Sequence, residues 1–189
     1  MQSNSFLDTV LIKDRTLILV ESALITIVGS LFIALCSQLS ILLPISPVPF
    51  TGQTLAVLLI ASLYGSRNGT LTVCLYLSEG FLGLPFFAGG SFGLTVLTGP
   101  TLGYLIGFVF AAYWIGRSSE KGKMRNFKSA LPSFLQAYII IFTFGVLWLS
   151  QFVGWKIAVF QGFVVFIPCE FIKLILLSSI LPTTWKFFN

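Results

Sequence analysis

The chain has 189 residues, of which 56% are hydrophobic and only 9% carry a charge, whereas a soluble domain is typically about 25% charged. The composition therefore predicts an integral membrane protein and excludes a soluble enzyme. The chain contains no histidine, which excludes Ser-His-Asp triads and histidine-based metal sites. The net charge of +5 is typical of basic cytoplasmic loops, so no nucleic-acid partner is expected. The three cysteines lie far apart without metal-site spacing, so no metal is expected, and no cofactor is expected either.

Apolar stretches of about 20 residues are expected to cross the membrane as helices. In chain order, the sequence predicts one all-α membrane domain, residues 1–189, with transmembrane helices over 16–43, 53–64, 70–79, 99–116, 130–152 and 168–188. Prolines in 44–52 and the turn Gly65–Gly69 separate the first three helices. The apolar stretch 154–167 is short for a span, so it is interpreted as a re-entrant or interfacial piece. Pro182 is expected to kink the last helix.

The distribution of basic residues predicts the orientation in the plasma membrane. With six spans and the N-terminus inside, the cytoplasmic side holds nine basic residues, and the outer side holds only Lys156. Basic residues are enriched in cytoplasmic loops, so both termini are predicted to lie inside. The nine are Lys13, Arg15, Arg67, Arg117, Lys121, Lys123, Arg125, Lys128 and Lys186. A five-span arrangement, with the C-terminus outside, is the less favoured alternative.

Glu170 and Lys173 form the most informative pair of charges. They are three residues apart near the start of a helix that begins at Pro168, so they lie on one face, with the carboxylate at the end that favours an anion. An ionisable residue inside a membrane span indicates a functional site; the alternative is a purely structural ion pair. No nucleophile lies beside them in the sequence, so the pair predicts ligand binding rather than catalysis.

A glycine-rich stretch over 80–97 follows the third predicted helix. Glycine permits unusual backbone angles and close approach to a ligand. The stretch has no basic residue, which disfavours phosphate binding, so it is interpreted as a flexible lid over an apolar pocket, with a merely compact loop as the alternative. The segment Gly116–Met124 departs from a phosphate loop in its spacing and at Met124, so the chain is not expected to hydrolyse ATP.

Small residues recur at helical spacing in two predicted helices. Gly99, Gly103 and Gly107 are interpreted as helix-packing positions, because small side chains let helices approach closely. A stripe in the first helix comprises Ser22, Thr26, Ser30 and Ala34. It is expected to face either another helix of this chain or a partner protein.

The segment Pro47-Val-Pro-Phe-Thr-Gly-Gln-Thr54 places hydrogen-bonding side chains just before the second predicted helix. The amide of Gln53 both donates and accepts, and Thr51 and Thr54 carry hydroxyls. These groups are candidates for ligand binding. Capping of the helix by Thr51 or Thr54 is the alternative, and the two roles are compatible.

The order of these motifs closely resembles the BioY family. The motifs are Pro-Val-Pro-Phe-Thr-Gly-Gln-Thr-Leu, Gly-Leu-Pro-Phe-Phe-Ala-Gly-Gly, Gly-Pro-Thr-Leu-Gly-Tyr-Leu-Ile-Gly-Phe and Ile-Pro-Cys-Glu-Phe-Ile-Lys, and the resemblance covers about residues 16–185. BioY proteins are the biotin-binding S components of energy-coupling-factor (ECF) transporters. The resemblance implies a six-helix bundle without enzymatic activity, with high affinity for biotin in a pocket near the outer surface. It also implies partners: the lipid bilayer, a membrane coupling protein and two ATPases.

The resemblance also assigns roles to individual residues. The family's acidic-x-x-Lys motif falls on Glu170 and Lys173, where aspartate is more usual at the first position. Its Pro-Thr-x-Gly-Tyr motif falls on Pro100 to Tyr104. The loop after the third helix lacks the arginine of some members, so Ser91 and backbone N–H groups are expected to serve instead. The expected ligand-binding residues are Thr51, Gln53, Phe87, Gly89, Gly90, Ser91, Tyr104, Glu170 and Lys173, and the expected partner contacts are Ser30 and Ala34.

Biotin carries two ureido N–H donors, one ureido carbonyl, an apolar thioether ring and a carboxylate, which suits an apolar pocket with a few directed polar groups. Glu170 is expected to accept a hydrogen bond from a ureido N–H. Lys173 is expected to keep Glu170 ionised and to donate to the ligand. Biotin is here the transported substrate rather than a cofactor. The alternatives are an S component for a different small vitamin and, less favoured for lack of catalytic motifs, an intramembrane enzyme.

Overall fold

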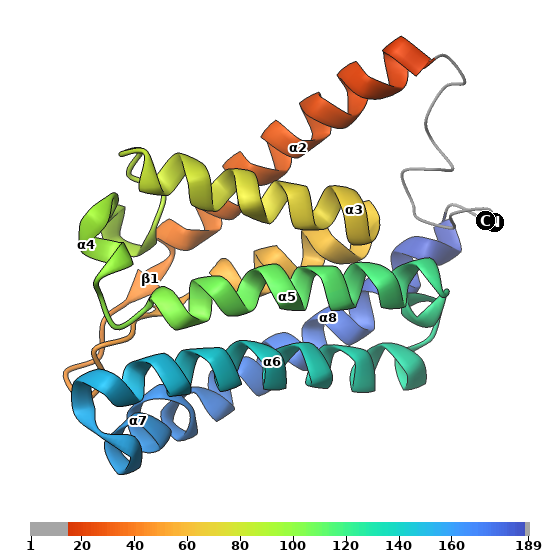
Figure 1. Ribbon diagram of the computed structural model, residues 1–189. Helices are drawn as coiled ribbons and strands as arrows, with labels where there is room; N and C mark the ends of the chain where they lie inside the picture. Colours follow the sequence, from red (N-terminus) through yellow and green to blue (C-terminus); the bar gives the residue numbers. More distant parts are fainter. Residues whose placement is uncertain (1–14, 188–189) are drawn as a thin grey trace.

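The computed structural model describes the backbone of residues 15–187 and the side chains of residues 20–183. Several residues that entered the predicted topology lie outside this described part: Lys13, Phe188 and the side chains of Arg15 and Lys186. The elements are α2 (Arg15–Gln38), β1 (Ser40–Ile41), β2 (Phe50–Thr51), α3 (Gln53–Phe81), η1 (Ala88–Gly90), α4 (Leu94–Leu97), α5 (Leu102–Glu120), η2 (Lys123–Arg125), α6 (Phe127–Val153), α7 (Trp155–Gly162), η3 (Val164–Phe166) and α8 (Ile167–Phe187) (Figure 1).

Helix α3 consists of two halves that meet at Gly65. This glycine has a φ of 79°, which a residue with a side chain rarely adopts. The second half folds back along the first and packs closely on it: a Cβ atom on Gly69 would lie only 2.8 Å from the Cα atom of Ala61. With these halves counted separately, the described residues form six long helices, the number that the sequence predicts. The turn needs only one non-helical residue, so the second half is longer than the predicted span 70–79.

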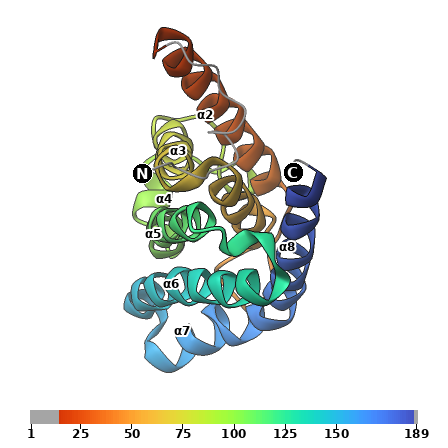
Figure 2. The ribbon, with the colours of Figure 1, turned by 90° about the vertical axis from the view of Figure 1, so that its right-hand side faces the viewer.

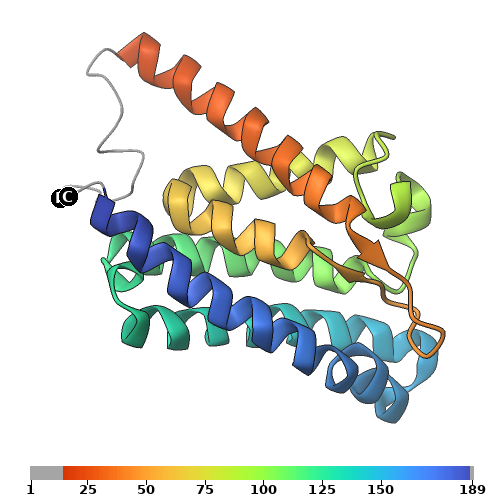
Figure 3. The ribbon, with the colours of Figure 1, turned by 180° about the vertical axis from the view of Figure 1, so that it is seen from behind.

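The six long helices form two layers. The second half of α3, α5 and α6 lie side by side in one layer (Figure 1), and α2, the first half of α3 and α8 form the other (Figures 1 and 3). Helix α2 reaches beyond the rest of the bundle at its N-terminal end (Figure 2). The β1–β2 ribbon, α4 and α7 gather at one end, which we call the loop end. The Gly65 turn and the α5–α6 connection lie at the opposite end, which we call the basic end.

Three stretches of the described chain are long and apolar enough to cross a membrane: Val20–Gln38, Phe127–Val153 and Trp155–Thr183. Large apolar side chains point outward from them, such as Val28 (61% exposed) and Leu35 (70% exposed) on α2. Exposed apolar surface on this scale is stable in lipid and not in water. The predicted all-α membrane fold is confirmed.

The first predicted helix is shorter than expected. Helix α2 ends at Gln38 rather than at residue 43, and the chain then forms a small antiparallel ribbon in which Ser40 pairs with Thr51. The ribbon lies close to the end of α2, as Gly52 shows: a Cβ atom there would lie 2.7 Å from the carbonyl oxygen of Cys36. Residues 39–43 are as apolar as the helical residues that precede them, so hydropathy did not reveal where the helix ends.

The stretch 154–167 is not a full span. Gly154 turns the chain with a φ of 80°, α7 then packs against α6, and η3 connects α7 to α8, which begins at Ile167. Ser46, in the loop between β1 and β2, donates a hydrogen bond to the carbonyl oxygen of Gln161 at 3.0 Å. The β1–β2 loop is thereby attached to α7 at the loop end. Pro182 lies inside α8, which continues to Phe187.

Glycines of α5 permit close helix contacts, as the sequence predicts. A Cβ atom on Gly103 would lie 2.4 Å from the backbone of Phe144, and one on Gly107 would lie 2.9 Å from that of Ile141, both on α6. At the basic end, the Glu120 carboxylate accepts hydrogen bonds from the backbone N–H (2.7 Å) and the hydroxyl (2.6 Å) of Ser66. Glu120 therefore caps the second half of α3.

The small-residue stripe of α2 faces α3. Ser30 and Ala34 are 0% and 6% exposed. A Cβ atom on the neighbouring Gly29 would lie 2.8 Å from the side chains of Tyr64 and Thr72. Of the two interpretations of the stripe, this packing matches the one in which it faces another helix of this chain, and the chain itself covers Ser30 and Ala34, the expected partner contacts. Close packing against α3 is the physical reason for their small size.

Gly116 offers a test of this packing. A Cβ atom there would lie 2.4 Å from the backbone of Gly65 and Ser66, which cannot move aside as a flexible side chain can. We expect Gly116→Val to destabilise the protein by about 3 kcal/mol, the upper end of overpacking effects. Thermal unfolding in detergent measures this. Tyr113→Ala, on the exposed face of the same helix, is the control, and an equal effect of the two variants would contradict the assignment.

Candidate functional site

A cavity of about 200 Å³ lies toward the loop end of the bundle. Five parts of the chain line it: the segment from the β1–β2 loop into α3, the loop between α3 and α5, the first turns of α5, the middle of α6, and the start of α8. The lining residues are Val48, Pro49, Thr51, Gln53, Thr54, Phe87, Ala88, Ser91, Val96, Thr101, Tyr104, Leu105, Phe108, Ile141, Phe142, Phe166 and Glu170. Most of them are apolar, and Glu170 is the one ionisable carboxylate among them.

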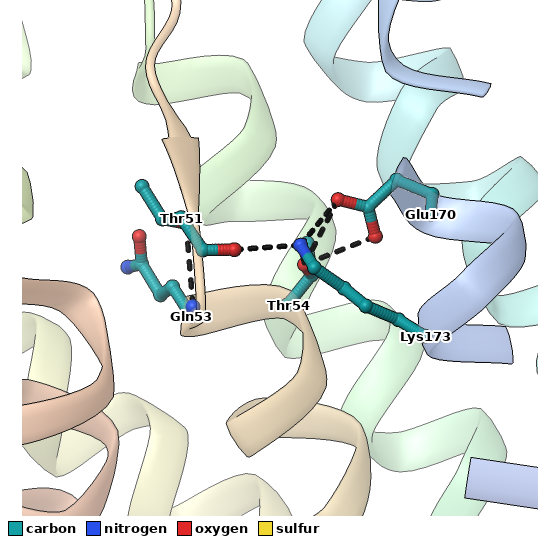
Figure 4. A network of polar contacts seen from close by, with 5 residues as sticks. All are labelled: Thr51, Gln53, Thr54, Glu170 and Lys173. Carbon is teal, nitrogen blue, oxygen red and sulfur yellow. Dashed lines mark hydrogen bonds and ion pairs between the residues drawn. The ribbon is translucent and has the colours of Figure 1, made fainter. Parts of the chain in front are cut away.

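Glu170 belongs to a buried polar network that joins α8 to the start of α3 (Figure 4). The Nζ atom of Lys173 lies 2.6 Å from Oε1 of Glu170. It also donates to the backbone carbonyl of Thr51 at 2.6 Å and to the hydroxyl of Thr54 at 3.0 Å. The Thr54 hydroxyl lies 3.1 Å from Oε2 and 3.3 Å from Oε1 of Glu170. Two buried charges thus compensate each other inside the bundle.

This network engages Lys173, one of the expected ligand-binding residues. The three donor hydrogens of a lysine ammonium match the three acceptors around Lys173, and Lys173 does not line the cavity. Lys173 is therefore committed to the protein and has no donor left for a ligand. Glu170 does line the cavity; its Oε2 atom lies 3.1 Å from the Thr54 hydroxyl, and the hydroxyl of the buried Tyr138 also interacts with this carboxylate. Glu170 thus places a carboxylate at the cavity wall, where a ligand N–H could reach it.

Thr51 and Gln53 both line the cavity. The backbone N–H of Gln53 donates to the Thr51 hydroxyl at 3.3 Å, so Thr51 also contributes to capping α3, as the alternative interpretation allowed. The side-chain amide of Gln53 donates to the Tyr76 hydroxyl at 2.7 Å. Among the described residues nothing donates to its amide oxygen, which leaves that oxygen as a second acceptor at the cavity wall.

The loop of residues 82–93, which we call the lid loop, contributes Phe87, Ala88 and Ser91 to the cavity wall. Gly89 and Gly90 do not line the cavity. They have φ values of 65° and 73°, and this left-handed geometry forms the turn that presents their neighbours. The lid loop is therefore an ordered wall of the cavity, and the role of its two glycines is conformational.

Tyr104 lines the cavity with its ring, and its hydroxyl is already engaged. The hydroxyl donates to the carbonyl of Gly162 in α7 at 2.7 Å. The ring occupies space left by Gly145 of α6, where a Cβ atom would lie only 2.2 Å from it. Tyr104 thus provides an apolar surface that is fixed between α6 and α7.

Sequence reasoning did not identify the aromatic wall. Phe108, Phe142 and Phe166 line the cavity from three different helical elements. The buried Tyr138 of α6 makes no hydrogen bond of normal geometry, and its hydroxyl interacts electrostatically with Glu170. In an apolar sequence these aromatics are indistinguishable from lipid-facing ones, so no local signal identifies them.

The buried ion pair yields a stability prediction. We expect Lys173→Met to destabilise the protein by about 3–5 kcal/mol, because Glu170 would remain as an unpaired buried charge. Adding Glu170→Gln should restore most of that loss. The control is Arg117→Met, which removes an exposed pair with Glu120 at the same sequence spacing and should cost under about 1 kcal/mol. Unfolding in detergent provides the values, and additive effects of the two site substitutions would contradict the coupling.

Comparison with known proteins gives consistent results. The family model described as "BioY family" matches residues 8–189. The biotin transporter BioY of Thermotoga maritima is 40% identical over 139 residues, covering 73% of this chain and 81% of that protein. BioY2 of Lactococcus lactis subsp. cremoris, also a biotin transporter, is 37% identical over 155 residues, covering 79% of this chain and 82% of that protein.

A solved structure has the same fold. The S component for biotin from an ECF-type ABC transporter matches with a TM-score of 0.81 and 26% identity, covering 93% of this chain and 95% of that chain. The match therefore extends over the whole six-helix bundle rather than over one helical hairpin. The family model, the relatives and the fold agree over most of the chain, and the motifs that carry the resemblance include most of the cavity residues. The chain belongs to the BioY family.

Proposed function

We propose that this protein is the high-affinity biotin-binding subunit of a vitamin uptake system and that it has no enzymatic activity. The observation that carries the proposal is the buried Glu170 carboxylate at the wall of an otherwise largely apolar cavity. Lys173, which does not line the cavity, compensates the charge of this carboxylate. A charge-compensated acceptor in an apolar pocket suits a neutral N–H donor such as a ureido group. The printed functions of the relatives support biotin as the ligand.

In this proposal Glu170 accepts a hydrogen bond from one ureido N–H, and the amide oxygen of Gln53 provides a further acceptor. The rings of Phe108, Phe142 and Phe166 pack against the thioether ring and the aliphatic chain. Ser91 and backbone N–H groups of the lid loop receive the carboxylate, because Lys173 has no free donor. Biotin is the cargo, and binding requires no cofactor. Among the described residues no cluster of metal-ligating side chains occurs.

The arrangement of charge supports the predicted orientation. Basic residues gather at the basic end, which includes the start of the second half of α3 and the α5–α6 connection, whereas the cavity lies toward the loop end. The positive-inside rule supports a cytoplasmic location for the basic end, and we infer from it that both termini lie inside. The cavity faces the outer side of the plasma membrane, from which a vitamin arrives.

Release of biotin to the cytoplasm requires energy that this chain does not supply, since it contains no phosphate-binding loop. We infer that a membrane coupling protein and two ATPases provide it. The S component with the same fold comes from an ECF-type ABC transporter, which supports such partners. Because Ser30 and Ala34 are buried, a partner that meets α2 would contact its outward apolar face instead.

Titration of the purified protein in detergent tests the binding site. We expect Glu170→Ala to weaken biotin binding at least tenfold, roughly 1.4 kcal/mol, because the ligand loses its charged acceptor. Glu79→Ala serves as the control, since this half-buried acid of α3 does not line the cavity. Unchanged affinity of Glu170→Ala would contradict the assignment. Tight binding of another small vitamin, with none of biotin, would favour the alternative S component.

A further inference from the structure

The lid loop is attached to two different helices. Its two ends are fixed to α3 by backbone hydrogen bonds: the N–H of Leu84 donates to the carbonyl of Glu79 at 3.1 Å, and the N–H of Gly93 donates to that of Gly80 at 2.9 Å. Its middle is held mainly by side chains. The two kinds of attachment therefore break independently.

The side chains that hold the middle come largely from the last turn of α2. The amide of Gln38 donates to the carbonyls of Pro85 (3.2 Å) and Phe87 (3.1 Å). The hydroxyl of Ser37 contacts the carbonyl of Phe86 as well as that of Ala34 in its own helix (2.6 Å), and its single hydrogen is shared between these two acceptors. Three consecutive carbonyls of the lid loop thus accept hydrogen bonds from two consecutive residues of α2. The Tyr76 hydroxyl of α3 also donates to the Phe86 carbonyl, at 3.1 Å.

These carbonyls determine where Phe87 lies. Its ring is 2% exposed, contacts Tyr76 edge-on with centroids 5.6 Å apart, and lies 5.2 Å from Phe81. It fills the space over Gly80, where a Cβ atom would lie 2.4 Å from the ring. Because Phe87 and the next residue line the cavity, a shift of the backbone at 85–87 opens the cavity wall.

Helix α2 is suited to control this attachment. It packs mainly on α3 and contacts the η1 turn, and it reaches beyond the bundle (Figure 2). Its outward face is apolar and exposed, as Leu31 (49%) and Leu35 (70%) illustrate. A tilt of α2 therefore moves Ser37 and Gln38 away from the lid loop while both ends of the loop stay on α3. Gly83 and Gly93, with positive φ values, lie close to these ends.

We propose that Ser37 and Gln38 form a latch that holds the lid loop over the cavity, so that the position of α2 sets the rate at which the ligand escapes. The two are positioning residues, since neither lines the cavity. The link from Gln53 through the Tyr76 hydroxyl to the Phe86 carbonyl connects the cavity wall to the same part of the loop. The ligand-escape part of the proposal rests on the proposed function.

The chain contains a matched control for this latch. Ser150 and Gln151 are the same dipeptide near the end of α6, where the serine bonds only to its own helix and the glutamine only to that serine. We compare the double variant Ser37→Ala/Gln38→Met with Ser150→Ala/Gln151→Met. Radiolabelled biotin is bound to the purified proteins and chased with excess unlabelled biotin. We expect dissociation to be at least tenfold faster for the latch variant and within twofold of wild type for the control.

Amide hydrogen exchange without ligand tests the latch separately from the proposed biotin-binding function. We expect faster exchange in residues 82–93 of the latch variant, with α5 and α6 unchanged, and no change in the control. If wild type binds no biotin, the proposed function fails, and this exchange still tests the latch. Gln38→Met alone, at an exposed position, is measured in parallel in case the double variant misfolds. Wild-type exchange of residues 82–93 in a folded latch variant would overturn the proposal, as would an unchanged dissociation rate in a protein that binds biotin.

Discussion

The site depends on the cost of placing a charge inside a membrane protein. An unpaired carboxylate or ammonium in the bundle would cost several kcal/mol, and the ion pair of Glu170 and Lys173 removes most of that cost. The pair needs further acceptors to satisfy the ammonium group, and the chain provides them from Thr51 and Thr54. The same contacts attach α8 to the start of α3. The contacts that compensate the two charges are therefore the same ones that join α8 and α3 at the cavity.

Close helix contacts make this assembly possible. Within a bilayer, helices gain little from burying apolar surface against each other, so they associate through tight packing and hydrogen bonds. Gly103 and Gly107 bring α5 against α6, Gly116 brings it against the Gly65 turn, and Gly145 makes space for the ring of Tyr104. Gly116 thus packs the basic end closely, whereas the contacts of Gly103 and Gly145 lie beside the cavity toward the loop end. The two ends are also distinguished by charge, which connects the packing to the proposed orientation.

The loop end is less regular, and its contacts come from segments far apart in the chain. The β1–β2 loop is attached to α7 through Ser46, and the lid loop is attached to both α2 and α3. Side-chain hydrogen bonds to backbone carbonyls carry much of this attachment, and single bonds of this kind contribute only about 1 kcal/mol. A cavity closed by several weak contacts opens without unfolding the bundle. This division between a rigid basic end and a separable lid agrees with the proposed capture and release of a small ligand.

The sequence by itself determined the membrane class, the six helices, the breaks at glycine and proline, the family and the pairing of Glu170 with Lys173, because these depend on composition or on neighbours along one helix. Tertiary structure decided that Lys173 is saturated by Thr51 and Thr54, that Ser30 and Ala34 are buried, and that aromatics from three helical elements line the cavity. The physical reason is that lipid-facing and inward-facing positions are equally apolar in a membrane protein, so hydropathy indicates a helix without indicating which face meets another.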